Sequence, residues 1–89
     1  MEDLESLRKR IAEVDAQIAE LIAKRLELAE MVAETKKESG LPIVDSQVEA
    51  KVVQRYRDAG ERYGIGADSM ESIARILISE AVAREKKVI

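Results

Sequence analysis

The sequence predicts an all-α protein of three helices, one long and N-terminal and two shorter. Every glycine and the only proline lie beyond residue 39, which leaves residues 2–38 as one segment of good helix formers. No segment alternates apolar and polar residues as a half-buried strand does. The 89 residues allow a single domain, residues 1–89, with a small core almost free of aromatic side chains. We therefore expect an oligomer whose chains share a core.

The first predicted helix carries an apolar stripe. Its members recur at spacings of three and four residues: Leu4, Leu7, Ile11, Val14, Ile18, Leu21, Leu28 and Val32. This spacing is typical of the seam of a coiled coil or of a long bundle helix. At 1.5 Å per residue the helix would exceed about 50 Å, more than the width of a compact domain of this size. One chain cannot cover such a stripe well, so we expect a second copy to cover it.

Turn and capping residues set the next boundaries. Gly40, followed by Pro42, predicts the end of the first helix. The second helix is expected to begin at Asp45 or Ser46, because Ser46–Glu49 (SQVE) matches a capping box, and to end near Gly64.

A further capping box, Asp68–Glu71 (DSME), predicts a third helix that extends to about Lys87. The two shorter helices each present an apolar face that we expect to be buried. The members of these faces are Val48, Val52, Tyr56, Ala59 and Tyr63 on the second helix and Ile73, Ile76, Leu77 and Ala81 on the third.

The composition excludes several classes of function. Without Cys or His the chain has no disulfide, thiol nucleophile, imidazole base or usual zinc site. A net charge of −3 argues against nucleic-acid binding, and no run of about 18 apolar residues is present to span a membrane. The acidic N-terminus lacks the pattern of a signal peptide. We expect a cytoplasmic protein with no cofactor and no metal, and with neither nucleic acid nor membrane as partner.

One cation interrupts the apolar stripe of the first helix. Arg25 occupies the position between Leu21 and Leu28, where burial of an unpaired guanidinium is costly. Taken alone, Arg25 is better explained as a polar residue that fixes helix register or oligomeric state, or as one whose charged end reaches solvent.

Other charged residues change this interpretation by their joint placement. They are Arg8 beside the stripe, Lys36 on a similar face, Asp45 and Glu49 at the start of the second helix, and Lys86 near the end of the third. Each alone fits a solvated surface charge. Together, Arg25 and Lys36 could offer a doubly anionic ligand a guanidinium and an ammonium group. Periodicity does not show whether these groups converge.

Four motifs follow one another along the chain. Leu7–Asp15 reads LRKRIAEVD, Ile22–Ala29 reads IAKRLELA, Val32–Lys36 reads VAETK, and Gly40–Asp45 reads GLPIVD with Glu49 following. They resemble, in order and spacing, the LRxxIxxxD, LLxxRxxLA, VxxxK and xxPxxDxxRE motifs of the all-helical chorismate mutases, a class also found fused to prephenate-processing enzymes. The resemblance spans essentially the whole chain.

The resemblance implies an intertwined homodimer with two active sites, in which chorismate rearranges to prephenate on the route to phenylalanine and tyrosine. It implies that Arg8 enters the partner's site, and that Arg8 and Arg25 hold the two carboxylates of chorismate. Lys36 would approach a carboxylate and the ether oxygen. Asp45 and Glu49 would meet the ring hydroxyl. This pericyclic reaction needs no nucleophile or metal, so a site can act by holding the reactive conformer and stabilising charge on the breaking ether oxygen.

The chain departs from the family pattern at three positions. Val48 stands where the family has an arginine, and Val82 aligns with a small hydroxyl residue of some members. Lys86 aligns with the glutamine that many members direct at the ether oxygen, and we expect its ammonium group to stabilise that oxygen. Ser79 is another polar candidate on the third helix.

Two other functions remain open from the sequence. Related helical lyases share the scaffold and its cations, and they convert isochorismate to salicylate and pyruvate. A non-catalytic helical dimer that regulates or tethers a partner enzyme would tolerate the apolar residues Val48 and Val82 at positions where the family is polar.

Overall fold

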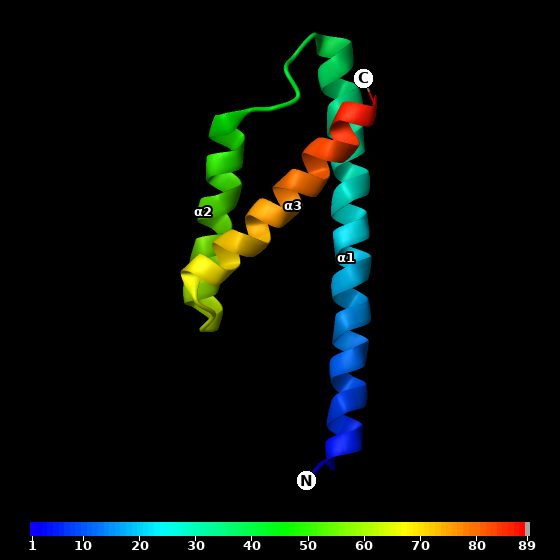
Figure 1. The fold of residues 1–89 in the computed structure, drawn as a ribbon, viewed down its shortest axis with the longest axis vertical. Helices are drawn as coiled ribbons and strands as arrows, with labels where there is room; N and C mark the ends of the chain where they lie inside the picture. The colour runs from blue at the N-terminus through cyan, green and yellow to red at the C-terminus, as the bar shows by residue number, and fades with distance from the viewer. Residues whose placement is uncertain (89) are drawn as a thin grey trace.

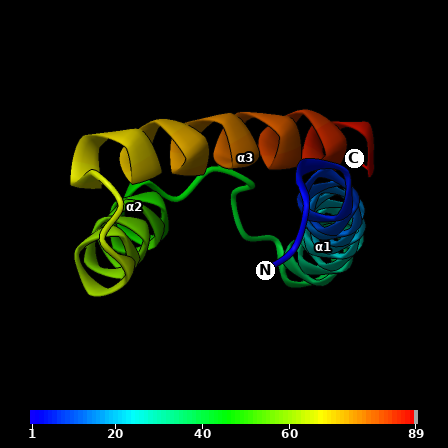
Figure 2. The same ribbon diagram turned by 90° about the horizontal axis from the view of Figure 1, so that it is seen from below.

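The computed structural model describes residues 1–88, which form three helices and no strand. Helix α1 spans Leu4–Ser39, α2 spans Ser46–Tyr63 and α3 spans Ala67–Val88 (Figure 1). The prediction of an all-α fold with one long and two shorter helices is confirmed. Helix α3 runs diagonally from the end of α2 to the end of α1 and packs against both. Within residues 1–88, α1 and α2 make no direct contact (Figure 2).

The ends of α1 are capped by local hydrogen bonds. The Asp3 carboxylate accepts a hydrogen bond of 2.8 Å from the backbone N–H of Ser6. At the other end Gly40 adopts a left-handed conformation, φ 69°, which allows the N–H of Leu41 to donate to the carbonyl of Lys36 at 2.8 Å. The predicted stop at Gly40 is therefore confirmed.

Both predicted capping boxes need correction. Asp45, not Ser46, caps α2, because its Oδ1 accepts from the N–H groups of Gln47 at 3.0 Å and Val48 at 3.2 Å. Helix α3 begins at Ala67, so Asp68 lies inside the first turn and does not cap it. The Asp68 carboxylate instead accepts a hydrogen bond from Arg57 of α2.

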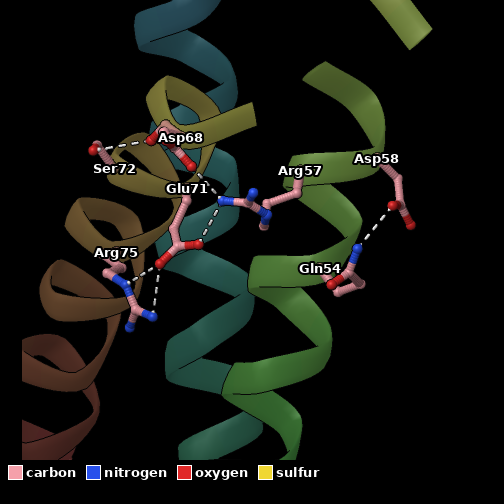
Figure 3. Close-up of polar contacts among 7 residues, drawn as sticks. All are labelled: Gln54, Arg57, Asp58, Asp68, Glu71, Ser72 and Arg75. Atoms are coloured by element: carbon pink, nitrogen blue, oxygen red, sulfur yellow. Dashed lines mark hydrogen bonds and ion pairs between the residues drawn. The ribbon is translucent and has the colours of Figure 1, made fainter. Parts of the chain in front are cut away.

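An ion-pair network joins α2 to the start of α3. Arg57 donates to Asp68 at 2.8 Å and to Glu71 at 2.9 Å, and Arg75 donates to the other carboxylate oxygen of Glu71 at 2.9 Å (Figure 3). Hydrogen bonds from Arg75 and Arg57 hold the pKa of the Glu71 carboxyl below its ordinary value. The network fixes the corner from which α3 departs toward α1.

The apolar stripe of α1 is left uncovered by its own chain. The molecule measures 57 × 24 × 15 Å, and the N-terminal turns of α1 extend beyond the other helices (Figure 1). The eight stripe residues are each between 42% and 63% exposed, whereas α1 buries only Leu26 and Ala33. Among the described residues, none of the helices is long and apolar enough to cross a membrane.

The inner faces of the shorter helices differ in part from the prediction. Val52 and Ala81 are buried as expected, but Ile73 and Ile76 are 46% and 64% exposed. The buried positions of α3 are Ala74, Ala81 and Glu85. Of the predicted α2 face, Val48 and Tyr63 are also exposed. Apolar residues cover more than one stripe of each helix. Within a single chain, only those that face a neighbouring helix are buried.

We predict that Gly60→Ala lowers the free energy of unfolding by about 1–3 kcal/mol, as overpacking does. A Cβ atom there would lie 2.9 Å from the carbonyl oxygen of Ile65 and 3.0 Å from Cγ of Met70. Without these contacts, alanine in a helix would be favoured by about 1 kcal/mol. Urea unfolding measures the change. Gly66→Ala, where the new Cβ would meet Ser69 Oγ at 3.4 Å, is the control, and a more stable Gly60→Ala protein would contradict the prediction.

Candidate active site

The three helices together line a cavity of about 290 Å³, a size suited to a small ligand. Its wall is mainly apolar and includes Leu28, Ala29, Val32, Ile43, Val48, Val52, Ile78, Ala81 and Val82. Five side chains with ionisable groups interrupt this wall: Arg25 and Lys36 from α1, Asp45 and Glu49 from the start of α2, and Glu85 from α3. The cavity exists because α3 bridges two helices that do not touch each other.

Arg25 and Lys36 reach the cavity from one face of α1. They lie eleven residues apart, about three helical turns, and both are half-buried. Lys36 Nζ donates a hydrogen bond of 2.8 Å to the carbonyl of Ile43, which ties the α1–α2 loop to the cavity. Within residues 1–88 neither cation forms an ion pair with a carboxylate. Both charges are therefore available to an anionic ligand.

The two acidic residues at the start of α2 lie in different environments. The Asp45 carboxylate is occupied by its two backbone N–H donors, so its side chain acts as a helix cap. Glu49, one turn later, is half-buried and lines the cavity. The structure thus brings Arg25, Lys36, Asp45 and Glu49 together, as their joint placement in the sequence suggested.

Glu85 is a cavity residue that the sequence analysis did not identify. It is only 9% exposed, the one buried charged residue among those described. Burial raises the pKa of the Glu85 carboxyl above its ordinary value; Lys36 and Arg25 oppose this shift, and Glu49 adds to it. The sequence did indicate this position. Glu85 lies at helical spacing from Ala74 and Ala81, so it shares with these two alanines one face of α3, and small residues on a helix face permit close packing.

Lys86 lies outside this cavity. Consecutive residues of a helix point about 100° apart, and here Glu85 lines the cavity whereas Lys86 does not. The Lys86 side chain is exposed and lines an adjoining groove with Arg75 and Ser79, and this groove shares Glu49, Ile78 and Val82 with the cavity. Glu85 thus lines the cavity of this chain, and the role predicted for Lys86 stays a prediction.

Arg8 is also absent from the cavity of its own chain. It lies seventeen residues before Arg25, about 25 Å along the axis of α1, and is exposed. Val48 and Val82 do line the cavity, so the departures from the family pattern make its wall more apolar. Among residues 1–88 no group of three or more acidic side chains could hold a metal ion.

The sequence is similar to that of several known proteins. The sequence pattern of the family described as chorismate mutase type II matches residues 7–86. The chain is 36% identical over 87 residues to the chorismate mutase of Methanocaldococcus jannaschii, covering 98% of this chain and 88% of that protein. It is 38% identical over 87 residues to the T-protein of Haemophilus influenzae, covering 98% of this chain and 23% of that protein.

Several relatives are much longer than this chain. A bifunctional chorismate mutase/prephenate dehydratase of Aquifex aeolicus is 33% identical over 91 residues, which cover 99% of this chain and 25% of that protein. The chain spans less than a quarter of the length of the T-proteins it matches.

We predict that Glu85→Gln stabilises the protein at neutral and alkaline pH. Because the pKa of Glu85 is raised in the folded chain, ionisation of this carboxyl opposes folding. That cost is complete above the folded pKa and absent once the group is neutral in both states, below about pH 4. The gain in urea midpoint should therefore vanish as the pH falls. Glu80→Gln, on the exposed side of α3, is the control, and a gain independent of pH would contradict the prediction.

Proposed function

Because this chain belongs to the type II chorismate mutase family, we propose that it catalyses the rearrangement of chorismate to prephenate in phenylalanine and tyrosine biosynthesis. One observation carries the proposal: Arg25 and Lys36 converge on a single, mainly apolar cavity of about 290 Å³. Such a cavity suits a compact carbon ring that bears two carboxylates.

Arg25 and Lys36 bind the anionic groups of the substrate. The Arg25 guanidinium pairs with one carboxylate, for which its planar donor set is well matched. Lys36, held by the Ile43 carbonyl, directs its remaining N–H donors at a carboxylate and the ether oxygen. Arg8 of a second copy of the chain supplies the cation for the other carboxylate. The apolar wall excludes water and favours the folded, reactive conformer of the substrate.

The ring hydroxyl of the substrate lies at the start of α2. Glu49 accepts its hydrogen bond, because this carboxylate lines the cavity. Asp45 contributes through its backbone and through the position it gives to the first turn of α2, since its carboxylate caps that helix.

The reaction breaks a C–O bond as a C–C bond forms, and negative charge grows on the ether oxygen. Lys36 stabilises that charge as an ammonium group, and Glu85 stabilises it as a neutral carboxyl that donates a hydrogen bond. The raised pKa of Glu85 supports this role, because only the protonated form is a donor. Lys86, for which the resemblance implied the same role, lies in the adjoining groove.

Two chains form the working unit in this proposal. The uncovered stripe of α1 supports it, because the exposed apolar residues from Leu4 to Leu21, which lie outside the cavity, need a partner surface. A second α1, with the same seam spacing, supplies such a surface in an intertwined homodimer. Residues 1–89 act as one domain of each subunit, and the cytoplasmic location expected from the sequence belongs to the same proposal.

We predict that Arg25→Met and Lys36→Met each lower kcat/KM for chorismate at least about 100-fold, as loss of a charged group at a developing oxyanion does. Prephenate formation by the purified protein is the measurement. Lys24→Met, which removes a neighbouring cation exposed on α1, is the matched control and should keep full activity.

Three outcomes would contradict the proposal. Wild-type protein without turnover of chorismate, at high concentration, would favour a regulatory dimer. Release of pyruvate from isochorismate, with chorismate left unchanged, would favour the lyase. Full activity of both variants would remove Arg25 and Lys36 from the site.

We predict that mixing two inactive variants restores activity. In a heterodimer of Arg8→Met and Arg25→Met chains, one site carries both changes and the other carries neither. After denaturation and joint refolding, random pairing should give about a quarter of the wild-type activity. Size-exclusion chromatography should show a dimer for each variant. A mixture with no more activity than its parts would contradict a shared site, and a stable wild-type monomer would exclude the dimer.

A further inference from the structure

The C-terminal half of α3 is attached to α1 by two polar contacts that flank Glu85. Arg84 Nη1 donates to Glu30 Oε1 at 2.8 Å, and Lys37 Nζ donates to the carbonyl of Val88 at 3.5 Å. Glu85 lies between these contacts along α3, one residue after Arg84. The two contacts thus hold both ends of the segment that carries the cavity carboxyl.

Apolar packing between α1 and α3 combines the large side chain of Leu26, 9% exposed, with small side chains. Ala33 of α1 is fully buried, and Ala81 of α3 is 6% exposed. A methyl group buries little area, so it contributes less to the adhesion of two helices than a leucine or isoleucine would. Small residues allow close approach, but they fix the depth and rotation of a helix less firmly than interlocking large ones. The two polar contacts at the edge of the α1–α3 interface therefore contribute to the position of α3 along with the apolar packing.

We propose that Arg84 is a positioning residue: its ion pair with Glu30 holds the last turns of α3 against α1 and keeps the Glu85 carboxyl in the cavity wall. The catalytic consequence rests on the proposed function, since it assumes that Glu85 acts on the substrate. The structural role of Arg84 does not depend on the proposed function. Arg84 itself is exposed, lines no part of the cavity and contacts α1 across the rim.

The pKa of Glu85 reports the position of α3. The charged groups that face this carboxyl are Arg25 and Lys36 from α1 and Glu49 from α2. Burial is the largest cause of the raised pKa. If α3 lifts from α1, water reaches Glu85 and its pKa moves down toward the ordinary value.

A direct effect of charge would give a different pattern. Removing the positive Arg84 by itself would raise the pKa of Glu85, and removing the negative Glu30 would lower it. Loss of a positioning contact lowers it in both cases. The sign of the shift in Arg84→Met therefore separates the two explanations.

The experiment is a titration of the Glu85 carboxyl carbon by NMR in Arg84→Met, Glu30→Gln and Lys37→Met, with the signal assigned through Glu85→Gln. We expect the midpoint to fall in all three variants, by about half a pH unit for an exposed contact of this kind. The exchanged pair, Glu30→Arg with Arg84→Glu, should return it toward the wild-type value. Glu20→Gln, which removes a carboxyl paired only within α1, is the control and should leave it unchanged.

Two results would overturn the proposal: a midpoint that rises in Arg84→Met, or midpoints that stay at the wild-type value in all three variants. Circular dichroism confirms that each variant remains helical. Prephenate formation is measured in the same samples. If the wild-type protein does not convert chorismate but the midpoints fall together, the proposed function fails and the positioning role stands.

Discussion

Helix α3 controls the geometry of this protein, because among residues 1–88 it alone contacts both other helices. The cavity is the space that remains beneath it between α1 and α2. The network of Arg57, Asp68, Glu71 and Arg75 fixes one end of α3, and its contacts with α1 fix the other. Any rotation of α3 would exchange Glu85 for a neighbouring residue in the cavity wall. A small tilt thus changes the chemistry of the site as well as its size.

The charges that line the cavity bear on the proposed dianionic ligand and on the proposed second copy of the chain. Formally, Arg25 and Lys36 bring two positive charges to the cavity, and Asp45, Glu49 and Glu85 bring three negative ones. A dianion is therefore better accommodated when Glu85 is protonated and when another cation also arrives. Burial favours the first condition, and Arg8 of a second copy would meet the second. Val48 and Val82 provide no polar group in compensation.

The shape of the molecule is also consistent with the proposed second copy of the chain. A helix of 36 residues is far longer than the segment that α3 can cover, so the N-terminal turns of α1 keep an exposed apolar row. Exposed rows of this kind are unfavourable in water and mark interaction surfaces. Arg8 lies on that part of α1, close to the row. Association that covers the row would therefore also bring Arg8 near another chain.

Much of the fold followed from local patterns in the sequence. Helix-forming composition, glycine placement and apolar spacing predicted three helices, the stop at Gly40 and the start of α2 near Asp45. The resemblance to the all-helical chorismate mutases implied that Arg25, Lys36, Asp45 and Glu49 belong to one site, and all four line the cavity. These features depend on residues close in sequence, or on one helical face, where spacing fixes direction.

Only the tertiary structure decided which faces of α2 and α3 meet the other helices. Helix α3 carries apolar residues on several sides, so its spacing did not show that Ile73 and Ile76 stay exposed while the alanine stripe turns inward. That choice depends on how closely α3 can approach α1, a contact between residues about fifty positions apart. The same rotation places Glu85 in the cavity wall and Lys86 in the adjoining groove.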